Sequence, residues 1–165
     1  MGITTKKGDK GETSVLSGEI VSKNDIIIHF EGTADELGSH LGLIKVMLQD
    51  SNTRQFIEEI QTILMKLIAH VSDSKNKKYF FSEEETAVLE KEINRLSEKL
   101  PKQFKFVLPG KSILEAHIHI ARTVARRAER MFVAVNSERE LCPYAASYMN
   151  RLSDYLFVLS QQDYI

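Results

Sequence analysis

The sequence predicts an all-α protein, a five-helix up-and-down bundle that follows an irregular N-terminal arm. From Thr33 onward, apolar residues recur at helical spacing in five segments separated by short polar loops. Residues 1–32 differ, because five of the eight glycines fall there among lysines and hydroxyl side chains. We therefore expect a single domain over residues 1–165, with an arm at 1–32 and a helical bundle at 33–165.

The arm contains one segment, residues 26–30 (IIIHF), that reads as a possible short strand. The first helix is expected to begin after Thr33 as N-cap, because Asp35 and Glu36 place acids in the first turn. Its apolar stripe comprises Ala34, Leu37, Leu41, Ile44 and Leu48.

Four more helices are expected from the same kind of pattern. The second covers residues 53–71, and the third begins at Ser82, which forms a capping box with Glu85, and ends before Pro101. The fourth covers residues 112–136, and the fifth runs from 144 to about 161 with Pro143 as a favourable first helical residue. The residues of the fourth helix expected to face the core are Ile113, Ala116, Ile120, Val124, Ala128, Met131 and Val135.

The bulk composition excludes several classes of protein. A formal net charge of −1 gives no reason to expect non-specific binding to nucleic acid or to a membrane surface. The single cysteine, Cys142, excludes an intramolecular disulfide and suits a reducing compartment. No apolar run reaches the roughly 18 residues of a membrane span, and the first residues resemble neither a secretory signal nor a transit peptide. We expect a cytoplasmic protein.

The arm carries the segment TKKGDKGETS, residues 5–14, which suits a polyphosphate. Glycines allow the backbone to approach a ligand closely, and exposed amides, lysines and hydroxyls bind phosphate oxygens. The spacing is not that of a P-loop. Taken alone, the segment is also compatible with a flexible polar terminus that binds nothing.

The fourth helix carries ARTVARRAER, residues 121–130. Arg122, Arg126 and Arg130 recur every four residues, so their guanidinium groups share one face, with Glu129 beside them. Arginine suits bidentate contacts with phosphate. The alternative is a solvated charged face that neighbouring helices neutralise.

Other polar residues give weaker signals. Asn150 and Asp154 share a face of the fifth helix, although Asp154 could simply pair with Arg151. His117 and His119 lie two apart on a helix, so they point to different faces and make a poor metal pair. We expect no protein metal site, and no side-chain nucleophile with a base partner can be recognised.

Five motifs in order carry a resemblance to a known family: TKKGDKGETS, GTADELGSHLG, FVLPG, HIARTVARRAER and NRLSDYLFVL. In this order and spacing they resemble the PduO-type ATP:cob(I)alamin adenosyltransferases over nearly the whole chain. The resemblance implies a homotrimer of five-helix bundles, with each active site between two subunits. It implies transfer of the 5′-deoxyadenosyl group of ATP to the cobalt of cob(I)alamin or a related corrinoid, forming adenosylcobalamin and releasing triphosphate.

The resemblance also assigns roles to residues. It implies that an ATP-binding arm and a nucleotide site on two helices hold the nucleotide. The arm residues are Thr5, Lys6, Lys7, Gly8, Thr13, Ser14 and Lys23. The helix residues are Arg126, Arg127, Ala128, Glu129, Arg130 and Asn150. Asp35 and Arg122 match a family pair that bridges the subunit interface near the corrinoid, and Phe106 matches the aromatic that helps exclude the lower base of cobalamin.

The chain departs from the family pattern at a few positions. Lys111 replaces a second glycine after Leu-Pro-Gly, and Glu115 and His117 replace small residues before the histidine of the fourth helix, here His119. Ser160-Gln161 replaces the usual Ala-Arg after the last motif. These departures concern the corrinoid side and the C-terminal end rather than the nucleotide motifs.

The implied chemistry needs no nucleophile from the protein, because Co(I) itself attacks the 5′ carbon. Mg²⁺ is expected to arrive with ATP, since no carboxylate cage for it is visible. Candidate partners beyond the substrates are a cob(II)alamin reductase and an adenosylcobalamin-dependent enzyme. Two other classes stay open on the residues alone, namely a corrinoid carrier without catalysis and a helical nucleic-acid binder that uses the arginine face.

Overall fold

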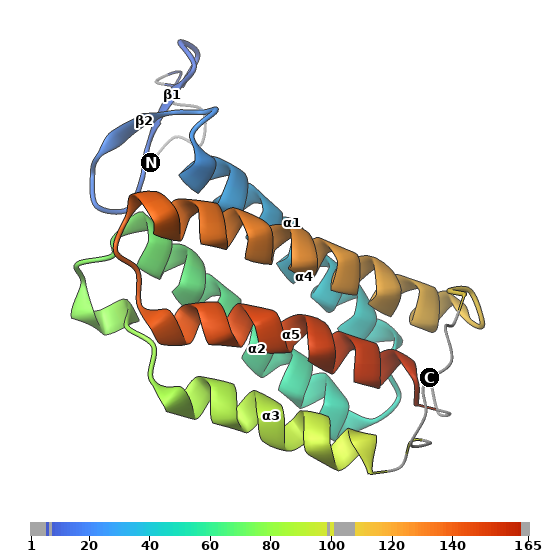
Figure 1. The fold of residues 1–165 in the computed structure, drawn as a ribbon. Helices are drawn as coiled ribbons and strands as arrows, with labels where there is room; N and C mark the ends of the chain where they lie inside the picture. Colours follow the sequence, from blue (N-terminus) through green and yellow to red (C-terminus); the bar gives the residue numbers. More distant parts are fainter. Residues whose placement is uncertain (1–5, 7, 99, 101–107, 163–165) are drawn as a thin grey trace.

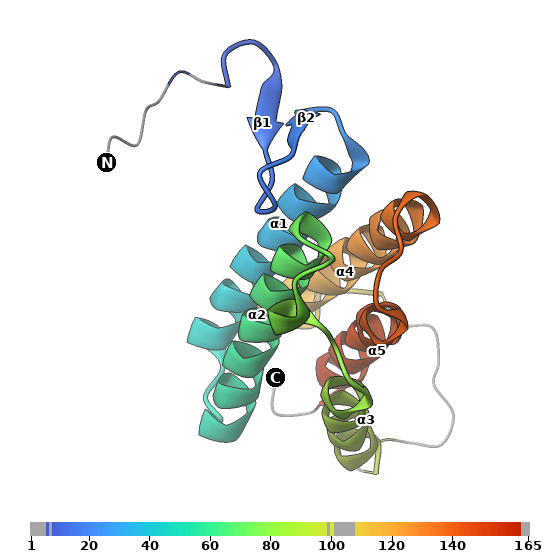
Figure 2. The same cartoon turned by 90° about the vertical axis from the view of Figure 1, so that its left-hand side faces the viewer.

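The structure, a computed structural model, describes residues 6, 8–98, 100 and 108–162. Within these residues it contains five α-helices that alternate in direction along the chain and a single two-stranded sheet at one end (Figure 1). Helix α1 packs against α2 and α4, and α4 and α3 each pack against α5 (Figure 2). The expected up-and-down bundle is therefore confirmed. None of the described helices is long and apolar enough to cross a membrane.

Helix α1 (Ile26–Met47) begins earlier than the sequence suggested. The expected strand at 26–30 is wrong, because these residues form the first turns of the helix, and the N-cap is Asp25 rather than Thr33. The Asp25 carboxylate accepts a hydrogen bond from the Ile27 amide at 2.9 Å. Phe30 is buried edge-on against Phe132, and this burial stabilises the helix although its first residues are β-branched and have a low helix propensity. The arm thus ends near residue 25.

Helix α2 (Ser51–Ser72) matches the expected segment within two residues at each end, and α3 (Glu83–Ser97) begins directly after Ser82 and ends before Pro101 as expected. A short 3₁₀ helix, η1 (Lys77–Tyr79), lies between them. The predicted capping box at Ser82 and Glu85 is present. Glu85 also receives a hydrogen bond from the Lys66 ammonium group. Burial alone would raise the pKa of Glu85, but the bonds from Lys66 and Ser82 outweigh it and lower the pKa to about 2.

Helices α4 (Ile113–Glu138) and α5 (Pro143–Ser160) also agree with expectation, with Pro143 in the first turn of α5. Val124, Ala128 and Val135 of α4 are buried as predicted. Ile113 and Ile120 are not, because both are exposed in the single chain.

The arm contains a hairpin that sequence reasoning missed. Strands β1 (Glu12–Ser14) and β2 (Ile20–Ser22) pair antiparallel, with Thr13 opposite Val21. Val15 and Val21 are buried and join the core of the bundle. The Arg139 guanidinium at the end of α4 donates to both carboxylate oxygens of Glu19 at 2.8 and 2.9 Å, and this bond raises the pKa of Arg139. The hairpin is therefore attached to one end of the bundle.

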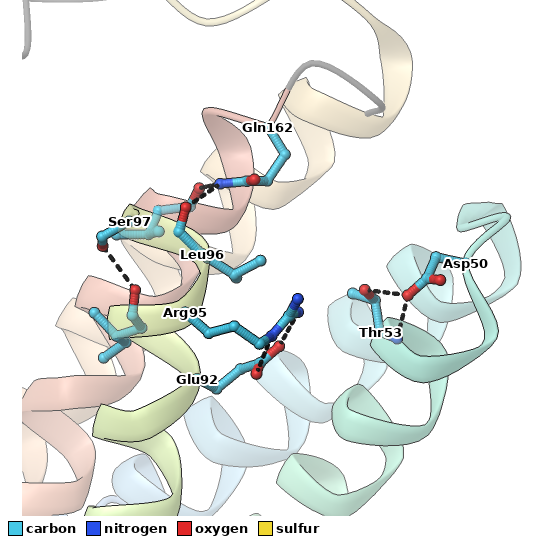
Figure 3. A network of polar contacts seen from close by, with 9 residues as sticks. Asp50, Thr53, Glu92, Arg95, Leu96, Ser97 and Gln162 are labelled. Atoms are coloured by element: carbon cyan, nitrogen blue, oxygen red, sulfur yellow. Dashed lines mark hydrogen bonds and ion pairs between the residues drawn. The ribbon is translucent and has the colours of Figure 1, made fainter. Parts of the chain in front are cut away.

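The opposite end of the bundle is held by polar contacts (Figure 3). The Gln162 side chain, just beyond α5, donates to the backbone oxygens of Val158 at 2.9 Å and Leu96 at 3.4 Å, which links the ends of α5 and α3. Asp50 caps α2 by accepting from the Thr53 amide at 2.7 Å. Helix α3 also ends here, and Phe106 of the FVLPG motif falls in residues 101–107, which lie outside the described residues.

Candidate functional site

The arginines of α4 occupy two different environments. Arg127 forms an ion pair with Glu36 of α1. Arg126 and Arg130 are exposed, and neither has an ion-pair partner among the residues that the structure describes. The alternative, in which neighbouring helices neutralise the face of Arg122, Arg126 and Arg130, has no support from ion pairs of these three residues among the described residues, since the pair with α1 is made by Arg127. Two cations one turn apart remain available to an anion.

The other positions of this segment are less exposed. Glu129 is half-buried, and the Ala128 side chain is fully buried in the core. Any contact that Ala128 makes with a ligand would have to be indirect, through the placement of its neighbours. The candidate nucleotide face of α4 thus reduces to the two exposed arginines with Glu129 between them.

The arm brings together two of its candidate residues. The Lys23 ammonium lies so close to Gly8 that a Cβ placed on Gly8 would meet Lys23 Nζ at 2.9 Å and Cε at 3.1 Å. The Lys23 amide also donates to the Gly11 carbonyl at 2.8 Å, and Gly11 has a positive φ of 84° that favours glycine. A side chain at position 8 would therefore displace the flexible end of Lys23, whereas glycine is favoured at position 11 by the backbone conformation.

Two hydroxyl residues and another candidate lysine of the arm lie near this contact in sequence. Thr13 is half-buried and Ser14 exposed, both in β1, and Lys6 is exposed with a positive φ of 57°. Thr5 and Lys7 lie outside the described residues. A lysine ammonium held against glycine backbone, with hydroxyls on the adjoining strand, is a suitable arrangement for phosphate oxygens.

Asp35 and Arg122 are not brought together within one chain. Helices α1 and α4 run antiparallel, in a register set by the Glu36–Arg127 pair and by the hydrogen bond from Thr33 Oγ1 to Met131 Sδ at 3.1 Å. In that register Arg122 lies about 9 Å along the helix axis from Asp35. Asp35 is exposed and lines a cleft of about 310 Å³ between α1 and α2, together with Gly38 and Gly42.

Arg122 has a contact that sequence reasoning missed. Its Nε donates to His119 Nδ1 at 3.3 Å, and His119 Nε2 lies 3.0 Å from Glu115 Oε1. The signal was present in the spacing, because residues three and four apart on a helix lie side by side. The burial of Glu115 and His119 was not visible in the sequence.

The structure says less about the remaining candidate residues. Asn150 is exposed on α5. Arg151 pairs with Asp154 at 3.1 Å, which was the alternative to a functional role for Asp154. Phe106 lies outside the described residues. Within the described part of the chain, no group of three His, Cys, Asp or Glu side chains gathers to hold a metal ion. The expectation that Mg²⁺ arrives with the nucleotide stays a prediction.

Comparison with known proteins identifies the group to which this arrangement belongs. Residues 3–162 match the cobalamin adenosyltransferase family. The chain is 37% identical over 167 residues to the corrinoid adenosyltransferase PduO of Salmonella typhimurium, covering 99% of this chain and 50% of that protein. It is 36% identical to the corrinoid adenosyltransferase of Bacillus subtilis, covering 98% of this chain and 86% of that protein. The chain therefore spans about half the length of the PduO relatives that it matches.

Solved structures agree with the sequence match. A variant of the PduO-type ATP:corrinoid adenosyltransferase from Lactobacillus reuteri, complexed with cobalamin and ATP, superposes with a TM-score of 0.89 at 32% identity, covering 97% of this chain and 92% of that one. Another variant of the same enzyme, complexed with ATP, gives a TM-score of 0.86 at 34% identity, again covering 97% of this chain and 92% of the other. With a sequence match over nearly its whole length and the same fold as these enzymes, this chain belongs to the cobalamin adenosyltransferase family.

Proposed function

We propose that this chain transfers the 5′-deoxyadenosyl group of ATP to the cobalt of cob(I)alamin or a related corrinoid. The observation that carries the proposal is the pair of exposed arginines on α4, Arg126 and Arg130, which have no ion-pair partner among the described residues, in a chain whose net charge is only −1. The solved relatives complexed with cobalamin and ATP support the choice of substrates. In the reaction, the electron pair of Co(I) forms a bond to the 5′ carbon, and the bond from that carbon to the triphosphate oxygen breaks.

The task of the protein is to align the substrates and to stabilise the leaving group. Negative charge grows on the triphosphate as the carbon–oxygen bond breaks, and fixed cations stabilise this charge in the transition state. Arg126 and Arg130 are suited to this role on α4, and Lys6, Lys23, Thr13 and Ser14 are suited to it in the arm. Glu129 and Asn150 would complete the nucleotide site. Thr5 and Lys7 belong to the same proposal, although they lie outside the described residues.

We also propose that the functional unit is a homotrimer with each site between two subunits. Two features support it. Asp35 and Arg122, a pair that the family resemblance places at one interface, are separated along the helices of a single chain, so a contact between them requires a second copy. Ile113 and Ile120 of α4 are exposed in the single chain although the sequence pattern places them with the core residues, as expected if another subunit covers them.

The cellular location of the chain and the role of Phe106 are proposals of the same kind. The single cysteine supports a cytoplasmic location. We propose that Phe106 helps to exclude the lower base of the corrinoid, which favours formation of Co(I). A cob(II)alamin reductase would then supply the reduced corrinoid to this chain, and an adenosylcobalamin-dependent enzyme would use its product.

The deciding experiment is a single-turnover assay with the purified protein, ATP, Mg²⁺ and chemically reduced cobalamin. An adenosyltransferase converts the cob(I)alamin spectrum to that of adenosylcobalamin only when ATP is present. A corrinoid carrier would bind the cofactor without this ATP-dependent change, and a nucleic-acid binder would do neither. Absence of the ATP-dependent change with folded protein would refute the proposed function.

A further inference from the structure

A line of polar contacts runs along the first three turns of α4 and ends at Arg122. Arg122 Nε donates to His119 Nδ1 at 3.3 Å, and His119 Nε2 lies 3.0 Å from Glu115 Oε1. The second oxygen of Glu115, Oε2, accepts from the backbone amides of Gly110 at 2.7 Å and Lys111 at 3.1 Å. The turn that precedes α4 is thus connected to Arg122 through two side chains.

The donors and acceptors in this line fix the protonation of the imidazole. An arginine nitrogen can only donate, so His119 Nδ1 must offer a lone pair to Arg122. The ring proton of the neutral imidazole then sits on Nε2, the nitrogen that lies 3.0 Å from Glu115 Oε1, although neither of these two atoms makes a hydrogen bond to the described residues. The negative charge of Glu115 beside Nε2 therefore favours the one tautomer of His119 that can accept from Arg122.

The burial of the pair indicates that it does more than cap the helix. Glu115 is 1% exposed and His119 is 5% exposed. Burying a carboxylate is costly unless it is fully bonded, and of the two Glu115 oxygens only Oε2 accepts hydrogen bonds from the described residues. The N-cap role at the start of α4 is already filled by Ser112, whose Oγ accepts from the Glu115 amide at 3.0 Å. Helix formation therefore does not require a carboxylate here.

We propose that Glu115 and His119 are positioning residues for Arg122, and that they couple its side chain to the turn at 108–111. This inference rests on the proposed function, in which Arg122 acts beside the corrinoid. By accepting from Nε, His119 sets the direction of the Arg122 guanidinium group. The two terminal nitrogens of Arg122 stay available for Asp35 of a second subunit, its expected partner. Because Glu115 also holds the Gly110 and Lys111 amides, a shift of the turn is transmitted to Arg122 through His119.

Glu115→Gln is the sharpest test, because it conserves shape and volume. The glutamine oxygen must still accept from the Gly110 and Lys111 amides, so its NH₂ group faces His119 Nε2 and makes that nitrogen an acceptor. The ring proton then moves to Nδ1, where it faces the Arg122 N–H. We expect kcat to fall about tenfold, as is usual when a group that orients a site residue is lost, with the KM for ATP changed less than twofold.

His119→Asn provides the rescue. The asparagine oxygen can occupy the place of Nδ1 and accept from Arg122 without help from Glu115. We expect this variant to stay within threefold of wild-type kcat, and adding Glu115→Gln to it should cause less than a twofold further loss. The same addition to Arg122→Ala should also cause less than a twofold loss, because both variants act through one guanidinium group. His117→Asn, at a neighbouring histidine outside the line of contacts, is the matched control and should retain wild-type kinetics.

A spectroscopic measurement tests the contacts independently of turnover. The ¹⁵N shifts of the His119 ring should show a pyridine-like Nδ1 and a pyrrole-like Nε2 in the wild-type protein, reversed in Glu115→Gln. The proposal is overturned if the wild-type ring carries its proton on Nδ1. It is equally overturned if wild-type protein turns over and folded Glu115→Gln keeps kcat within twofold, or loses the same factor in the Arg122→Ala background. If wild-type protein shows no ATP-dependent turnover, the proposed function fails, whereas the ring shifts still decide the contacts.

Discussion

Replacement of Arg126 by alanine should separate catalysis from stability more cleanly than any other change on α4. Arg126 is exposed and has no ion-pair partner among the described residues, so its removal breaks no ion pair between them. Surface substitutions of this kind change the free energy of unfolding by less than about 0.5 kcal/mol. The thermal unfolding midpoint of Arg126→Ala should therefore stay close to that of the wild-type protein.

The effect on the reaction should be much larger. A cation about 4 Å from a leaving-group oxygen contributes on the order of 4 kcal/mol at an effective dielectric constant of about 20. Removing one fixed donor to a developing anion typically costs about 3 kcal/mol. At about 1.4 kcal/mol for each factor of ten, we expect kcat to fall by about two orders of magnitude.

The assay is the ATP-dependent conversion of cob(I)alamin, followed spectrally under single-turnover conditions. Arg54→Ala, an exposed arginine on α2 away from the candidate site, controls for loss of surface charge and should retain wild-type kcat. A folded Arg126→Ala protein whose kcat lies within threefold of wild type would refute the assignment of Arg126 to the leaving triphosphate.

Three further outcomes are expected. Mixing inactive Lys6→Ala with inactive Arg126→Ala should restore part of the activity through hybrid sites between subunits, and a monomeric mass by light scattering at working concentration would contradict this. Gly8→Ala should raise the KM for ATP severalfold with little change in the unfolding midpoint, because the new Cβ displaces only the flexible end of Lys23; an unchanged KM would exclude the Lys23 contact from ATP binding. Because the pKa of Glu85 is about 2 in the folded chain and 4.5 ordinarily, its carboxylate contributes stability above about pH 4.5 that is lost as the pH falls toward 2. In denaturant titrations, the free energy of unfolding should fall between pH 7 and pH 3 by on the order of 2 to 3 kcal/mol less in Glu85→Gln than in the wild-type protein. An identical fall in both proteins would argue against this role of Glu85.

The bundle could be predicted because its signals are local in sequence. The stripe of Leu37, Leu41 and Ile44 and the capping box at Ser82 depend only on residues within a few turns of one another, and all of them appear in the structure. The start of α1 could not be predicted in the same way. Residues 26–28 are three isoleucines, whose local preference is for a strand, and the helix is favoured instead by burial of Ile27 and Phe30 against the bundle.

The candidate site was predictable where residues are neighbours on a helix, and not where the fold brings distant residues together. The spacing of Arg122, Arg126 and Arg130 is visible in the sequence, but the pairing of Arg127 with Glu36 depends on the packing of α4 against α1. The contact between Arg139 and Glu19 joins residues 120 positions apart, with no local signal. The three-residue strands of the arm were missed because so short an alternation cannot be distinguished from a loop.

Helix α4 imposes a constraint on how chains of this architecture can vary. It is continuous over 26 residues, about 39 Å. Glu115 lies in its first turn, Arg126 near its middle, and Arg139, which holds the hairpin, directly after it. Insertion or loss of one residue within it would rotate everything beyond that point by about 100° and shift it by about 1.5 Å. Natural variation in this segment should therefore consist of substitutions, with changes of length confined to the connections on either side.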